Sequence, residues 1–136
     1  MVRIILAVIG GFLAWSILWV GTDQVLISMF PDWYGAHQLG FEKAFTNKTA
    51  FEASTTILGL HLVREVLITL AVGYLTALIA GENRRSTLIL GVLLLLFGIG
   101  VQAMAWNYIP VWYHFLFLFL LVPLTVMGGK LRSKLA

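Results

Sequence analysis

Cysteine is absent from this sequence of 136 residues, and charged residues are scarce. The lack of cysteine excludes disulfides, thiolate metal sites and a thiol nucleophile. Aspartate, glutamate, lysine and arginine make up 11% of the chain, whereas hydrophobic residues make up 60%. Soluble domains carry about 25% charged residues. With so few charges a water-soluble fold could not cover its own surface, and lipid must therefore form part of the solvent.

Motifs for catalysis and for nucleotide binding are missing as well. The sequence has no HExxH, no glycine-rich phosphate loop, no nucleophile turn followed by a histidine and an acid, and no aspartate pair for metal-phosphate chemistry. We therefore expect no enzyme, no catalytic residue, no cofactor and no metal site. The basic tail is short and suits anionic lipid headgroups, so nucleic acid is not an expected partner.

The gaps between charged residues predict four membrane-spanning helices. The first gap, Ile4–Thr22, approaches the roughly 30 Å of a hydrocarbon core at about 1.5 Å per residue. The uncharged stretch 86–129 would run about twice that thickness, so it must reverse once, and Pro110 suits the start of a new helix. The prediction is an all-α, polytopic four-helix bundle in a single domain, residues 1–136, with helices at about 4–22, 54–81, 86–106 and 111–128.

Two parts of this assignment have an alternative. Met1–Gly21 could be a cleaved signal peptide, but the apolar run continues past Trp19 and no small-x-small cleavage site follows, so a first membrane helix is expected. Residues 23–53 contain Pro31 and most of the acidic residues and predict one long outer loop. The loop also carries Leu39, Phe41 and Phe45, which indicate either a short helix on the membrane surface or a cap packed on the bundle.

The distribution of basic residues predicts the orientation. One side of the predicted bundle collects six of them against a single acid, Glu82: Arg3, Arg84, Arg85, Lys130, Arg132 and Lys134. The other side holds four acids against two lysines: Asp23, Asp32, Glu42 and Glu52 against Lys43 and Lys48. Both termini are therefore expected in the cytoplasm. Aromatic residues gather near the outer boundary, as in a membrane belt: Trp33, Tyr34, Trp106, Tyr108, Trp112 and Tyr113.

Polar residues within the predicted spans form a candidate intramembrane cluster. His61, Arg64 and Glu65 lie three and four residues apart, which places them on one helix face. Gln102 and His114 lie within about 2 Å of the depth of Glu65. We expect Glu65 to pair with Arg64, Gln102 or His114. Such groups either stabilise the bundle or form a site for an ion or small polar ligand, and haem ligation by the two histidines is a third, weaker alternative.

The last helix carries a distinctive ending. Pro110-Val-Trp-Tyr-His114 is followed by Pro123 and then by Gly128-Gly-Lys-Leu-Arg132, and an earlier stretch, Gly73–Gly81, leads into an arginine turn. In these stretches the chain resembles a group of uncharacterised small bacterial four-helix inner-membrane proteins. The resemblance implies a bacterial inner-membrane protein with four helices, and it assigns no activity, ligand or catalytic residue.

Two functions remain open from the sequence. The first is an accessory or assembly subunit packed against a larger membrane complex or against itself, because the chain is small and small residues would allow close helix contacts: Gly10, Gly11, Ala14, Gly91, Gly98 and Gly100. The alternative is a homo-oligomeric transporter or channel with its site at Glu65, Gln102 and His114, although the two halves of the chain show no repeat.

Overall fold

The structure is a computed structural model that describes residues 2–135, and within them the chain is all-α. Four helices are long and apolar enough to cross a membrane: α1 (Val2–Met29), α3 (Thr55–Ala80), α4 (Arg85–Met104) and α5 (Val111–Leu135). Between the first two lie a short π-helix, η1 (Pro31–Gly35), and α2 (Ala36–Asn47). The predicted fold class is confirmed, and the protein is a small integral membrane protein with four spans.

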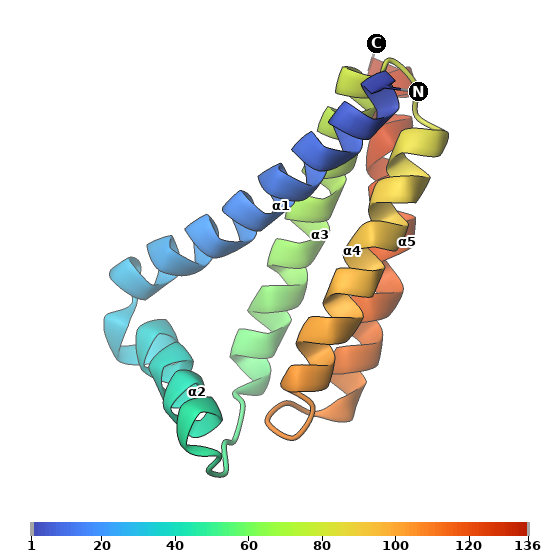
Figure 1. Ribbon diagram of the computed structural model, residues 1–136. Coiled ribbons are helices and arrows are strands. Elements are labelled where there is room, and N and C mark those ends of the chain that lie inside the picture. Colours follow the sequence, from blue (N-terminus) through green and yellow to red (C-terminus); the bar gives the residue numbers. More distant parts are fainter. Residues whose placement is uncertain (1, 136) are drawn as a thin grey trace.

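The four long helices converge at one end and separate at the other (Figure 1). Both chain termini lie at the converging end, which we call the terminal end and which includes Arg3 and the 81–85 turn. From there α3, α4 and α5 run side by side, whereas α1 leans away from them. The opposite end, the cleft end, holds α2, the end of α1 and the turn between α4 and α5.

The first helix is longer than the sequence predicts. It runs through Asp23 to Met29, seven residues beyond Thr22. The carboxylate of Asp23 accepts hydrogen bonds from the Tyr34 hydroxyl and from Gln38 Nε2 (2.9 Å), and it lies 3.8 Å from Arg64 Nη1. Because these partners neutralise and solvate the charge within the protein, Asp23 does not end the helix.

The segment predicted as a long loop is mostly helical. Of residues 23–53, only Phe30 and residues 48–53 lie outside α1, η1 and α2. The rings of Phe41 and Phe45 on α2 contact Tyr108 of the α4–α5 turn, with centroids 6.0 and 5.8 Å apart. This contact supports the cap packed on the bundle rather than a helix that inserts these rings into the membrane. Leu39 is exposed on the other side of α2.

The last helix is also longer than predicted, since α5 runs to Leu135, seven residues beyond the expected end at 128, whereas the other helix boundaries agree closely with the sequence prediction. The side chain of Ser54 accepts a hydrogen bond from the backbone N–H of Ile57 and begins α3, and Gly81 in the left-handed conformation ends that helix. The turn between α4 and α5 ends at Pro110, as expected. Of the predicted aromatic belt, Trp33, Trp106 and Trp112 are exposed, whereas Tyr34 and Tyr113 are buried inside the protein.

At the terminal end, glycines bring helices into direct contact. A side chain at Gly73 would overlap the backbone carbonyl oxygen of Thr125, and one at Gly128 would overlap that of Leu70, so α3 and α5 touch through their backbones at two levels. A side chain at Gly11 of α1 would overlap the side-chain hydroxyl of Thr76, so α1 and α3 also pack closely there. The glycines of this region are therefore used for packing within the protein.

Candidate functional site

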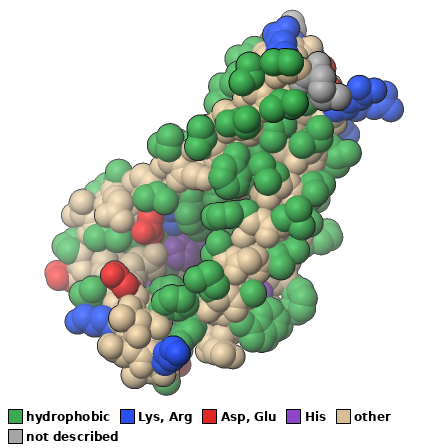
Figure 2. Space-filling model, in the orientation of Figure 1, with side chains coloured by type: hydrophobic (Ala, Val, Ile, Leu, Met, Phe, Trp, Pro, Cys, Tyr) green, Lys and Arg blue, Asp and Glu red, His purple; other side chains and the backbone are tan. Residues whose placement is uncertain are grey.

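A cleft lies between α1 and α4, and residues of α2, α3 and α5 line it as well. We call it the lateral cleft, because it opens between two membrane-spanning helices; its volume is about 390 Å³. Figure 2 shows it as a hollow on one face of the molecule with histidine at its bottom. This size and a mostly apolar lining with a few polar groups are typical of sites for small organic molecules.

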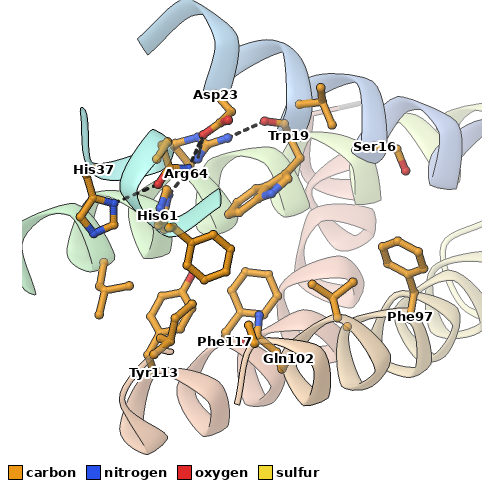
Figure 3. A pocket seen from close by; sticks show the side chains of 18 of the residues that line it. Ser16, Trp19, Asp23, His37, His61, Arg64, Phe97, Gln102, Tyr113 and Phe117 are labelled. Carbon is orange, nitrogen blue, oxygen red and sulfur yellow. Dashed lines mark hydrogen bonds and ion pairs between the residues drawn. The ribbon is translucent and has the colours of Figure 1, made fainter. Parts of the chain in front are cut away.

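Aromatic side chains form most of its walls. Trp15 and Trp19 of α1 stack on each other with centroids 5.4 Å apart, and Trp19 meets Phe117 of α5 edge to face at 5.6 Å. Phe97 of α4 stands on the opposite wall, where its ring contacts Phe12 (Figure 3). These rings separate α1 from α4 and α5, since an indole needs far more space than the glycines of the terminal end.

A buried polar cluster around Arg64 closes one side of the lateral cleft. The Arg64 guanidinium donates hydrogen bonds to Thr22 Oγ1 (3.1 Å from Nε and 3.0 Å from Nη2) and to the carbonyl oxygen of Trp19. Its Nη1 donates to the Tyr34 hydroxyl and to His61 Nδ1, both at 2.9 Å. Arg64 is 6% exposed and joins α1, η1 and α3 in one network.

Two further contacts fix this cluster. The guanidinium carbon of Arg64 lies 4.2 Å from the centre of the Trp19 ring, in a cation–π arrangement. Burial and the hydrogen bond to Asp23 raise the pKa of Tyr34, so its hydroxyl keeps its proton and donates it to the carboxylate. The charges of Arg64 and Asp23 thus balance each other inside the protein.

A second polar pair includes Gln102, which lines the lateral cleft across from Arg64 (Figure 3). Gln102 of α4 hydrogen-bonds His114 Nδ1 of α5, and His114 Nε2 lies 3.1 Å from the carbonyl oxygen of Ile109. The ring of Trp106 stacks on His114 at 4.8 Å. Both ring nitrogens of His114 thus have partners in the protein, which leaves neither available to ligate haem iron.

Glu65 belongs neither to the polar cluster around Arg64 nor to the pair of Gln102 and His114. It is fully buried, yet neither carboxyl oxygen has a hydrogen-bond partner within residues 2–135. The prediction that Glu65 pairs with Arg64, Gln102 or His114 is therefore wrong. Successive residues of a helix point about 100° apart, so Arg64 faces α1 and the cleft while Glu65 is not among the residues that line it.

The structure thus divides the predicted cluster into three parts. It brings His61 together with Arg64 on one wall of the lateral cleft, it joins Gln102 of the other wall to His114, which does not line the cleft, and it leaves Glu65 outside. Sequence analysis missed the partners of Arg64 in the first helix and the supposed loop: Trp19, Thr22, Asp23 and Tyr34. The charge of Asp23 at the depth of Arg64 was the available signal for this pairing.

Fold and site together define a small integral membrane protein with four spans and a lateral cleft that has polar groups at one end. Comparison of the chain with protein-family models, with curated proteins and with solved structures finds no match.

Proposed function

We propose that this is a non-catalytic accessory protein of the bacterial inner membrane, and that it holds an amphipathic molecule from the bilayer in its lateral cleft. The observation that carries the proposal is the opening of the bundle at one end only. There α1 leaves α4, and the space between them has aromatic walls and polar groups from His61 and Gln102. A molecule in the bilayer can enter such a cleft sideways, with its tail along the walls and its head at the polar groups.

The orientation follows from the two ends of the bundle. Basic side chains of the terminal end include Arg3, Arg84 and Lys130, whereas Asp23, Asp32 and neighbouring acids belong to the cleft end. The positive-inside rule then puts the terminal end in the cytoplasm and the lateral cleft in the outer half of the bilayer.

The chain offers a clean test of this orientation because it has no cysteine. Single cysteines at two exposed positions, Glu42→Cys on α2 and Arg84→Cys beside the first residue of α4, are compared in intact spheroplasts. A membrane-impermeant maleimide should label the first variant and reach the second only after the membrane is permeabilised. The reverse pattern would overturn the proposed orientation.

Partners of the accessory role would be other membrane subunits, whereas a second copy of the chain would be the partner in the transporter alternative. Fewer small residues are available for contact with a partner than the sequence indicates, because Gly11, Gly91 and Gly98 pack inside the protein. Among the glycines of that group, Gly100 alone has open space beside it. The proposal therefore rests on the lateral cleft rather than on glycine faces.

A homo-oligomeric transporter or channel receives less support. The cleft occupies one half of the bundle, and in the other half α3 and α5 meet through their backbones at Gly73 and Gly128. A solute could not pass between these two helices without separating them. Glu65, the acid that would serve such a pathway best, does not line the cleft.

The test is native mass spectrometry of the protein extracted in polymer nanodiscs from its own membranes. Wild type is compared with Val101→Trp, which fills the cleft, and with Ile99→Trp as the matched control, because Ile99 has a similar exposure on α4 but does not line the cleft. We expect wild type and Ile99→Trp to carry a bound amphiphile together with larger subunits. Val101→Trp should lose the amphiphile by at least about tenfold while keeping its fold.

Three results would contradict the proposal. Equal amounts of amphiphile on Val101→Trp and wild type would show that the cleft is not the binding site. If no amphiphile were bound to the wild-type protein, the proposed binding of an amphipathic molecule would be wrong. A defined homo-oligomer without larger subunits would favour the transporter alternative.

A further inference from the structure

We infer that the lateral cleft is selective for a neutral amphiphile whose head is a planar ring bearing oxygen atoms, the chemistry of membrane quinones and quinols. This inference rests on the proposed function and names the class of molecule that the cleft would hold. It follows from the state of Arg64, from the hydrogen-bonding groups that remain free in the cleft, and from the shape of its aromatic walls.

Arg64 has no donor left for an anionic head. A guanidinium has five N–H groups, and here Nε–H bonds Thr22, the two of Nη1 bond Tyr34 and His61, and the two of Nη2 bond Thr22 and the carbonyl oxygen of Trp19. Its charge is balanced by Asp23. No lysine of the described chain lines the cleft. A phosphate head, which needs a free cation, therefore finds none.

His61 provides a hydrogen-bond donor instead. Arg64 donates a hydrogen to His61 Nδ1, so that nitrogen is the acceptor of the ring and the ring proton lies on Nε2. A second proton on Nδ1 would face the N–H of a cation and is excluded on that ground. The side chain is 8% exposed and lines the cleft, and Nε2–H has no partner among residues 2–135.

Gln102 provides an acceptor on the opposite wall. His114 Nε2 lies 3.1 Å from the Ile109 carbonyl oxygen and 3.4 Å from that of Trp106, so Nε2 carries a hydrogen. The structure places Gln102 Oε1 next to Nδ1, but in a neutral imidazole Nδ1 is then an acceptor, so the amide must turn by 180° and present its NH₂ group to that nitrogen. The amide oxygen of Gln102 is thereby left for a ligand. A doubly protonated ring would instead be a buried cation without a carboxylate, which is costly.

Tyr113 adds a hydroxyl that can donate or accept. Its side chain is 3% exposed and lines the cleft, its ring centroid lies 6.5 Å from that of His61, and its hydroxyl makes no hydrogen bond within the part of the chain that is described. One donor, one acceptor and one hydroxyl suit a head that carries carbonyl or hydroxyl oxygens. The aromatic walls, including Trp19 and Phe117, favour a flat ring over a flexible glycerol backbone.

The inference is tested with the purified full chain in nanodiscs of phosphatidylcholine, loaded with a ubiquinone that carries a decyl tail. Bound quinone is measured by native mass spectrometry and by quenching of tryptophan fluorescence, since Trp15 and Trp19 lie in the cleft. Tyr113→Phe removes a hydroxyl that has no protein partner and should weaken binding about fivefold, the effect of one hydrogen bond. Tyr74→Phe, a tyrosine outside the cleft, is the matched control and should bind as wild type does.

Two competing lipids show whether a negative result contradicts only the inferred ligand class or also the proposed function. Phosphatidylglycerol and diacylglycerol should each fail to displace the quinone at equal concentration. If one of them is retained in place of the quinone and is lost in Val101→Trp, the ligand class is wrong and the proposed function stands. If wild type retains none of the three, both fail. Quinone binding that is unchanged in Tyr113→Phe would overturn the assigned recognition.

Discussion

The two ends of this bundle differ in the size of the side chains between the helices. Near its start α1 buries Ala7, Val8 and Gly11 against its neighbours, whereas further along it turns Trp15 and Trp19 inward. Small residues let backbones touch, and indole rings keep them apart. The terminal end is thus closed and is stabilised by van der Waals contact between helices (Figure 1). The cleft end is open and is stabilised by the hydrogen bonds that Arg64 donates (Figure 3).

The largest expected effect comes from breaking the cleft end. Arg64→Met removes the donor that joins α1, η1 and α3 and leaves the carboxylate of Asp23 without its cation. We expect a loss of about 3 kcal/mol in the free energy of unfolding, because a partly buried charge remains unpaired. Unfolding by denaturant in mixed micelles measures the loss.

A double variant sharpens this prediction. Arg64→Met combined with Asp23→Asn no longer leaves a charge unpaired, so it should recover part of the stability lost in the single variant. Equal stability of the single and double variants would show that the ion pair does not hold the cleft end together.

A smaller effect is expected at the closed end. Gly73→Ala places a methyl group against the backbone carbonyl of Thr125 and forces α3 and α5 apart, which should cost about 1–3 kcal/mol. The same substitution at Gly100, where a methyl group meets open space, should be neutral or stabilise α4 by up to about 1 kcal/mol. Thermal unfolding of the two variants under identical conditions gives the comparison, and equal shifts would contradict the backbone contact.

The smallest effect concerns the turn at the terminal end. Partial burial raises the pKa of Glu82, but backbone N–H groups of Arg85, Ser86 and Arg84 donate to its carboxylate and together lower the pKa from 4.5 to about 2. A lowered folded-state pKa stabilises the protein above pH 4.5, and this stability is lost as the pH falls from 4.5 towards 2. Glu82→Gln should remove this pH dependence at a cost of about 1 kcal/mol at neutral pH.

Melting temperatures between neutral pH and pH 3 measure this difference. Glu42→Gln is the matched control, because Glu42 is exposed on α2. A pH profile of Glu82→Gln that still falls as steeply as that of wild type would show that another carboxylate is responsible.

Part of this architecture could be predicted from the sequence because lipid imposes simple rules. The four spans, the turn before Pro110 and the helix end at Gly81 follow from run lengths, a missing backbone donor and a left-handed glycine. The end of α1 could not be predicted in this way. Asp23 marks a boundary only if its charge is unpaired, and its partners Tyr34 and Arg64 lie 11 and 41 residues further along the chain.

The candidate site shows more clearly that contacts between distant residues could not be predicted from the sequence. Depth in the membrane, which a residue count gives, places Glu65, Gln102 and His114 together. Their rotation about the helix axes decides whether they meet, and it brings Gln102 to His114 while Glu65 faces neither. Counting from a charge at the end of a helix carries no information on which neighbouring helix a side chain faces.

By itself, the sequence determined that the protein is helical, spans a membrane four times and carries its basic residues at one end, because hydrocarbon demands long apolar helices and charges are restricted to the ends. Only the tertiary structure decided that α1 diverges, that Arg64 uses all its donors within the protein, and that His61 and Gln102 face a common cleft. These features depend on which side-chain volumes and hydrogen-bonding groups meet between helices, and residues far apart in the chain supply them together.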